Sequence, residues 1–126
     1  MVVDDNPINR MIFRKQLEAW GMVVETSDSA VSASARMLAP ASDAPIEILL
    51  LDEMMPDVSG SDFAQQLRLN ERWADLPIIL ATSAGEFLST EASQRLFTRR
   101  LTKPVRQSSL FDTLIGVATE RLPARD

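Results

Sequence analysis

Short apolar runs alternate along this chain with longer segments in which apolar residues recur at helical spacing. The apolar runs predict strands at residues 1–3, 22–26, 46–51, 77–81 and 99–102. Helices are predicted to begin at Asn6, at Ser27 or Asp28, at Ser61 or Asp62, at Leu88, and at Ser108 or Ser109. Strands that alternate with helices indicate an α/β fold with a parallel sheet covered on both faces.

The segment after the first strand carries the clearest helix signals. Asn6 can cap a helix, Pro7 suits the first helical position, and Gly21 suits a left-handed end. Two apolar stripes run along this helix, one from Ile8, Met11 and Ile12 and one from Phe13, Leu17 and Trp20. We therefore expect it to be covered on more than one side.

Acidic and basic residues follow several of the predicted strands. The central run stops at Asp52 and is followed by turn formers, Pro56, Asp57, Ser59 and Gly60. Parallel strands of an open α/β sheet bind ligands at their carboxyl ends. Four predicted strands end in acidic, hydroxyl or basic residues, namely Asp4 and Asp5, Asp52, Thr82 and Lys103. We expect them to meet at one site.

Size and composition limit the possible functions. The chain has 126 residues, a net charge of −5, no cysteine and no histidine. It can bury one sizeable core, and we expect one domain over residues 1–121 with a linker from 122 to 126. The first strand is so short that we expect the chain to begin inside its natural domain. Histidine catalysis and cysteine or histidine metal sites are excluded, so any metal must be a hard cation held by oxygens.

The charge and hydropathy pattern also bears on partners. The acidic balance argues against direct nucleic-acid binding, and no apolar run is long enough to cross a bilayer. We expect a cytoplasmic location, either alone or as a domain of a membrane-anchored protein. A homodimer is compatible with the sequence.

Three carboxylates that converge would repel one another unless a cation lies among them. Mg²⁺ suits such a site because it prefers oxygen ligands and accepts phosphate alongside one or two carboxylates. Asp52 is then placed to attack phosphorus, Lys103 to pair with a phosphoryl oxygen, and Thr82 to donate a hydrogen bond. Each motif alone is weak, because an Asp at a strand end is often only a cap.

Four stretches, in this order, resemble the receiver domain of bacterial two-component response regulators. They are residues 2–6 (VVDDN), 51–60 (LDEMMPDVSG), 80–84 (LATSA) and 101–105 (LTKPV). Residues 4–10 (DDNPINR) and 102–108 (TKPVRQS) are most similar to receivers attached to hybrid sensor histidine kinases. The resemblance covers essentially the whole chain.

The resemblance implies a flavodoxin-like fold of five strands in the order 2-1-3-4-5 and a role in phosphorelay signalling. Asp52 would accept a phosphoryl group from a histidine kinase or a histidine phosphotransfer domain. Mg²⁺ would bind Asp5, Asp52 and the backbone carbonyl of Met54 directly, and Asp4 through water. Thr82 and Lys103 would contact the phosphoryl group, and the Lys103–Pro104 bond would be cis. The resemblance is compatible with an output or sensor domain in the same chain, and no independent metabolic activity is expected.

Three positions depart from the family pattern. Arg100 stands where the family has its switch aromatic, Ser83 where it has a small residue, and residues 94–99 lack the usual Gly-Ala. We therefore expect a remodelled surface before and along the fifth strand, with a basic spot from Arg99 and Arg100 that reaches an acidic partner.

Three other functions compete with a phosphorylated receiver. The first is a pseudo-receiver that binds partners without phosphorylation, which the missing aromatic and Gly-Ala would suit. The second is an aspartyl-phosphate hydrolase of another α/β family. Such families carry an Asp-x-Asp pattern at the nucleophile, but the residue two after Asp52 is Met54. The third is a dinucleotide-binding module, which lacks its Gly-rich loop here.

Overall fold

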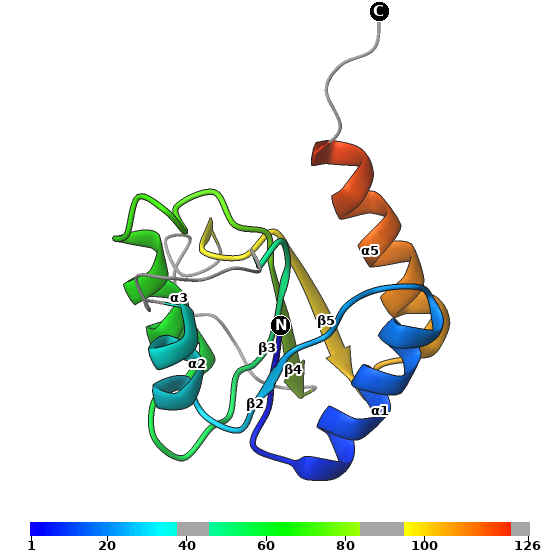
Figure 1. Ribbon diagram of the computed structural model, residues 1–126, viewed down its shortest axis with the longest axis horizontal. Coiled ribbons are helices and arrows are strands. Elements are labelled where there is room, and N and C mark those ends of the chain that lie inside the picture. The colour runs from blue at the N-terminus through cyan, green and yellow to red at the C-terminus, as the bar shows by residue number, and fades with distance from the viewer. Residues whose placement is uncertain (38–45, 84–94, 122–126) are drawn as a thin grey trace, which may run out of the picture.

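Five parallel strands form one sheet in the order β2-β1-β3-β4-β5 (Figure 1). The computed structural model describes residues 1–37, 46–83 and 95–121. The strands are β1 (Val2–Val3), β2 (Thr26–Ser27), β3 (Leu49–Asp52), β4 (Ile78–Ser83) and β5 (Arg99–Lys103). The described helices are α1 (Pro7–Ala19), α2 (Ala30–Met37), α3 (Gly60–Arg68) and α5 (Gln107–Arg121). The predicted α/β fold and its strand order are confirmed.

Helices cover both faces of the sheet, with α2 and α3 on one side and α1 and α5 on the other (Figure 1). Alternate residues of each central strand point to opposite faces. Leu49 and Leu51 of β3 therefore pack in the cluster that holds α2 and α3, whereas Leu50 packs in the cluster that holds α1 and α5. Because both faces are buried, the central strands are continuous apolar runs.

Each helix presents a narrow apolar face to its side of the sheet. On one side, the fully buried side chains include Met37 of α2 and Phe63 and Leu67 of α3. On the other side, Phe13 and Leu17 of α1 pack with Leu110 and Val117 of α5. Only one of the two stripes predicted on α1 is therefore buried, because Ile8, Met11 and Ile12 are between 46% and 62% exposed.

Two strands, β2 and β3, are shorter than the apolar runs predict. Residues 22–25 and 46–48 are not in strands, although the sequence predicts strands there. Val2 and Val3 of β1 pair with Thr26 and Ser27 on one side and with Leu50 and Leu51 on the other. A residue belongs to a strand only where a neighbouring strand lies opposite and pairs with it. Because β1 spans only two residues, only two residues of β2 are paired.

Helix starts are set by particular side chains. Asn6 accepts hydrogen bonds from the amides of Ile8 and Asn9, and Gly21 has a φ of 87°, so both predicted ends of α1 are confirmed. Three other predicted starts are wrong. The last helix, α5, begins at Gln107 rather than at Ser108 or Ser109. Ser59 rather than Ser61 or Asp62 caps α3, and Ser29 rather than Ser27 or Asp28 accepts the amide of Ser32 at α2.

The predicted helix from Leu88 lies mostly outside the described residues, as does the predicted linker at 122–126. Among the helices in the described parts of the chain, none is both long and apolar enough to span a bilayer.

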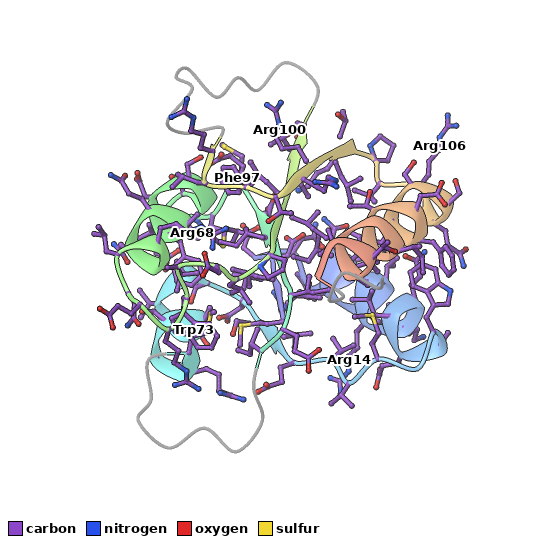
Figure 2. The ribbon with its side chains drawn as sticks, turned by 90° about the horizontal axis from the view of Figure 1, so that it is seen from above. Arg14, Arg68, Trp73, Phe97, Arg100 and Arg106 are labelled. Atoms are coloured by element: carbon purple, nitrogen blue, oxygen red, sulfur yellow. The ribbon has the colours of Figure 1, made fainter. Side chains whose placement is uncertain are left out.

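The end of α3 is joined to the segment before β5 by one arginine. Arg68 donates hydrogen bonds to the carbonyls of Leu96, Trp73 and Ala74 at distances between 2.8 and 3.2 Å. Figure 2 shows Arg68 directed inward from α3. Burial lowers the pKa of its guanidinium, and Asp75 acts in the opposite direction.

Candidate functional site

The sheet register brings the predicted site residues to one edge. Val3 lies beside Leu51, so Asp4 and Asp5 follow β1 next to the end of β3, which is Asp52. Asp52 lies beside Ala81 of β4, and Ser83 lies beside Lys103 at the end of β5. The polar residues collect at this edge because all the strands are parallel and their carboxyl ends lie together.

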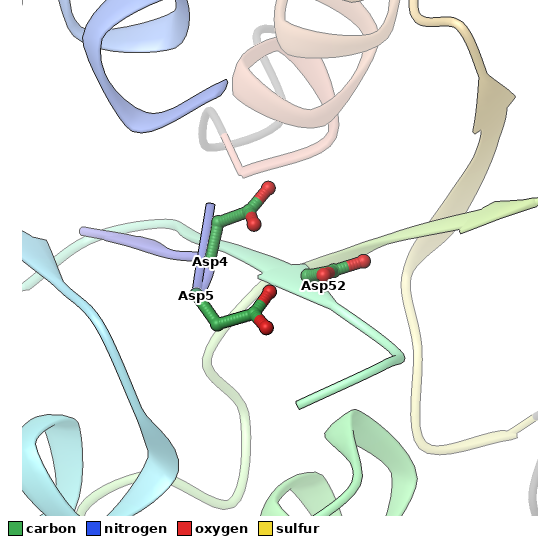
Figure 3. Close-up of side chains that lie close together, drawn as sticks. All are labelled: Asp4, Asp5 and Asp52. Atoms are coloured by element: carbon green, nitrogen blue, oxygen red, sulfur yellow. The ribbon is translucent and has the colours of Figure 1, made fainter. Parts of the chain in front are cut away.

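Asp4, Asp5 and Asp52 form the acidic cluster of this site. Each offers a carboxylate oxygen, and these oxygens lie within 4.8 Å of one another. Asp4 and Asp52 are buried, whereas Asp5 is exposed. Figure 3 shows the three side chains projecting to the same side of the strand ends. The cluster is thus buried on one side and open to solvent on the other.

Lys103 supplies the compensating positive charge. Its ammonium nitrogen lies 2.6 Å from Oδ1 of Asp52, and the Asp52 side chain is only 4% exposed. Burial raises the pKa of the Asp52 carboxyl above its usual range. The hydrogen bond and charge of Lys103 lower this pKa, while the charges of Asp4 and Asp5 raise it. Lys103 therefore offsets only part of the cost of holding three carboxylates together.

The acidic loop after β1 is held by the first turns of α1. Oδ1 of Asp4 accepts the amide of Asn6 at 2.9 Å, and the Arg10 guanidinium donates to the Asp4 carbonyl at 2.6 Å. These bonds orient Asp4 and place Asp5 beside it at the edge of the sheet. A charge-assisted bond of this length is among the stronger ones in proteins.

The turn between β3 and α3 keeps a fourth carboxylate away from the cluster. Glu53 follows Asp52 directly, but its carboxylate accepts hydrogen bonds from the Ser61 amide at 3.0 Å and the Ser61 hydroxyl at 2.5 Å. Gly60 closes the turn by donating its amide to the Glu53 carbonyl at 2.9 Å. The sequence did not predict these contacts of Glu53. The available signal was an acid directly after a predicted strand and eight residues before Ser61.

Thr82 and Met54 lie at the rim of the site. Thr82 is half-buried and follows Ala81, the register partner of Asp52, but no hydrogen bond joins its hydroxyl to Asp52 within the described residues. The Met54 side chain is 65% exposed in the turn after β3. The Lys103–Pro104 peptide bond is cis, as expected.

The cluster fits a hard divalent cation. Two buried carboxylates and one exposed carboxylate face one lysine, and burial already penalises the ionised form of Asp52. A cation among these oxygens would remove the repulsion, and the exposed side would leave room for waters and a phosphoryl oxygen.

Comparison with known proteins identifies the family. The sequence profile described as "Response regulator receiver domain" matches residues 1–115. The chain belongs to the response regulator receiver domain family. Its core fold agrees with a solved response regulator receiver protein from Pseudomonas putida, with a TM-score of 0.78 and 28% identity over 91% of this chain and 93% of that one.

The receiver domain is also similar to parts of longer signalling proteins. It is 35% identical over 69% of its length to Hybrid signal transduction histidine kinase L of Dictyostelium discoideum, and covers 5% of that protein. It is 28% identical over 97% of its length to the Sensory/regulatory protein RpfC of Xanthomonas campestris, and covers 17% of that protein. The chain thus spans a small part of these relatives.

The unusual Arg100 of this receiver lies on the edge strand of the sheet. It is exposed and points away from the helices in Figure 2, and it lies beside Leu80 in the register. Arg99 is half-buried and donates to the Thr98 carbonyl at 2.8 Å. The basic spot and its acidic partner stay predictions.

Proposed function

We propose that residues 1–121 act as a phosphoacceptor module in which Asp52 takes a phosphoryl group from a phosphohistidine on a partner. The observation that carries the proposal is the buried Asp52 carboxylate, 2.6 Å from Lys103 and within 4.8 Å of two further carboxylates. Membership of the receiver domain family supports the same assignment.

In the proposed reaction, an oxygen of Asp52 forms a bond to phosphorus as the bond from phosphorus to the donor imidazole nitrogen breaks. The ring nitrogen keeps the electron pair of the broken bond. Lys103 moves its hydrogen bond from the Asp52 carboxylate to a phosphoryl oxygen, and Thr82 donates its hydroxyl to another. The new mixed anhydride adds negative charge at the strand ends and biases the surrounding surface.

Mg²⁺ is the proposed cofactor. Asp5, Asp52 and the backbone carbonyl of Met54 would hold the ion directly, and Asp4 would act through water. The ion would neutralise the negative charge of the phosphoryl oxygens. Asp4 and Asp5 would orient the ion and keep it beside Asp52.

A small-molecule donor tests the proposal. The protein is incubated with acetyl phosphate with and without Mg²⁺, and its intact mass is measured beside Asp52→Ala and Asp62→Asn. Asp62 is an exposed acid in the first turn of α3 and controls for loss of a charge near the site. We expect one Mg²⁺-dependent phosphoryl adduct in the wild type and in Asp62→Asn, and none in Asp52→Ala. No adduct on folded wild-type protein would favour a pseudo-receiver instead.

The partner is proposed to be a histidine kinase or a histidine phosphotransfer domain. A cavity of about 410 Å³ opens beside the site and is lined by Asn9, Ile12, Phe13, Lys103, Pro104 and Val105. The exposed apolar side chains of Ile8, Met11 and Ile12 extend this surface along α1, and such patches often mark contacts with proteins.

This surface can be tested separately from the chemistry. Ile12→Ser should slow transfer from a phosphohistidine protein but leave phosphorylation by acetyl phosphate unchanged, because the small donor needs no docking surface. Val23→Ser, an exposed position before β2 and away from the cavity, is the control. Equal slowing with both donors would contradict the docking role.

A further inference from the structure

The turn between β3 and α3 is attached to a helix that contributes nothing to the acidic cluster. Oδ2 of Asp57 accepts the backbone amide of Val31 at 2.9 Å, although 26 residues separate the two in sequence. Val31 lies in the first turn of α2, where Ser29 accepts the amide of Ser32 at 3.1 Å. Asp57 therefore completes the cap of a helix from outside that helix.

Asp57 is ionised over the neutral pH range, so its partner role at Val31 is that of a carboxylate. Hydrogen bonds from backbone amides, that of Val31 first, lower the pKa of the Asp57 carboxyl. The carboxylate also complements the partial positive charge at the start of α2. The contact is electrostatic and directional, and it fixes where this part of the turn lies.

Packing holds the turn only in part. Met55 and Val58 are half-buried against the core, but Met54, Pro56 and Asp57 are exposed. At its two ends the turn is closed by the bond from the Gly60 amide to the Glu53 carbonyl and by the bonds from Ser61 to Glu53. Within the described residues, the hydrogen bond from the Val31 amide to Asp57 joins this outer part of the turn to α2.

We propose that Asp57 is a positioning residue for the metal, which uses its hydrogen bond to α2 to hold the turn that presents the Met54 carbonyl beside Asp52. This inference rests on the proposed function, since it concerns the same Mg²⁺ site. It assigns α2 a part in metal binding, although α2 carries no ligand. Loss of the bond frees the outer turn, so the ligand carbonyl is less often in place and Mg²⁺ binds more weakly.

Two substitutions at one position separate the hydrogen bond from the charge. Asp57→Ala removes both, whereas Asp57→Asn removes the charge and keeps a carbonyl oxygen that can accept the Val31 amide. Asp62→Asn removes a nearby exposed charge and leaves the turn intact. Mg²⁺ alone is titrated into each protein, and its dissociation constant is read from the backbone amide signals of Asp52 and Glu53 by NMR.

We expect Asp57→Ala to raise the Mg²⁺ dissociation constant by about tenfold. This is the lower end of the range seen when a contact that supports metal ligands is lost. Asp57→Asn and Asp62→Asn should stay close to the wild type. Thermal unfolding of each protein shows that it is folded at the temperature of the titration.

Three outcomes would overturn the inference. Unchanged Mg²⁺ affinity in Asp57→Ala with a lower unfolding temperature would make Asp57 only a helix cap. Equal weakening in Asp57→Ala and Asp57→Asn would assign the effect to charge rather than to the bond. Failure of folded wild-type protein to bind Mg²⁺ would instead overturn the proposed metal site, and the role of Asp57 with it, so the two failures are distinguishable.

Discussion

Lys103 and Asp52 form an ion pair at 2.6 Å although their strands, β5 and β3, are separated by β4. The Lys103 side chain is 26% exposed and Asp52 is 4% exposed, so the pair lies at the boundary between the sheet and solvent. The lysine thus reaches over the end of β4 to the one carboxylate that ends the central strand. Several properties of this receiver domain follow from that arrangement.

Loss of the lysine should affect both the acid and the reaction. In Lys103→Met the pKa of Asp52 should rise further, because a hydrogen bond and a charge that lower it are gone. Phosphorylation by acetyl phosphate should slow by about a hundredfold, the usual effect of removing one group that stabilises transition-state charge. Carboxyl NMR titration and intact mass measure the two effects. Arg106→Met, at an exposed arginine, should change neither.

The raised pKa of Asp52 makes stability depend on pH. The folded protein holds the proton more tightly than the unfolded chain, whose value is near 3.8. The contribution to stability is therefore fully present below that value and is lost as pH rises through the folded pKa. Asp52→Asn should remove this loss and be more stable than the wild type at pH 7 without Mg²⁺. Urea unfolding from pH 4 to 8 tests this, and parallel curves for the two proteins would contradict it.

Mg²⁺ should stabilise the folded receiver domain. An ion that binds only the folded state at a hundred times its dissociation constant adds about 2.7 kcal/mol. Asp5→Asn should lose most of this gain in stability, because Asp5 belongs to the acidic cluster and is a proposed direct ligand of the ion. Thermal unfolding with and without Mg²⁺ is the measurement. Asp62→Asn should keep the full gain, and an equal loss there would point to a general charge effect.

Gly60 is required by the close approach of two segments of backbone. A Cβ at this position would lie 2.5 Å from the Asp52 carbonyl oxygen and 3.0 Å from the Glu53 Cα. Gly60→Ala should therefore shift the end of β3, cost about 1–3 kcal/mol of stability and slow phosphorylation. Gly116→Ala in α5 is the matched control, because nothing lies within 4 Å of its Cβ. That variant should be neutral or about 0.5–1 kcal/mol more stable. Chemical denaturation of both variants decides the matter.

Arg68 should matter more for stability than its position near a helix end suggests. Arg68→Ala would remove the guanidinium that donates to the carbonyls of Leu96 and Ala74, and would leave the Trp73 carbonyl with the Leu76 amide alone, at a cost of about 2 kcal/mol. Arg14→Ala removes an exposed ion pair with Glu18 and should cost about 0.5 kcal/mol or less. Urea denaturation compares the two, and equal costs would show that the Arg68 contacts contribute little.

Local and repeated signals in the sequence determined most of the fold. Continuous apolar runs indicated strands buried on both faces, and Asn6, Pro7 and Gly21 marked the ends of α1 because the caps of this helix are made by residues adjacent to it in sequence. The assembly of Asp4, Asp5, Asp52 and Lys103 could also be predicted, since parallel strands place their carboxyl ends at one edge of a sheet.

Tertiary structure decided which of several similar side chains does what. The charged Arg68 donates hydrogen bonds to backbone carbonyls, whereas the apolar Leu69 beside it is 84% exposed, because α3 ends at these residues. Glu53 resembles a further acid of the site, yet it caps α3, and Asp57 resembles a turn residue, yet it caps α2. These roles depend on which backbone amide lies opposite each carboxylate, and such contacts exist only once distant segments have packed together.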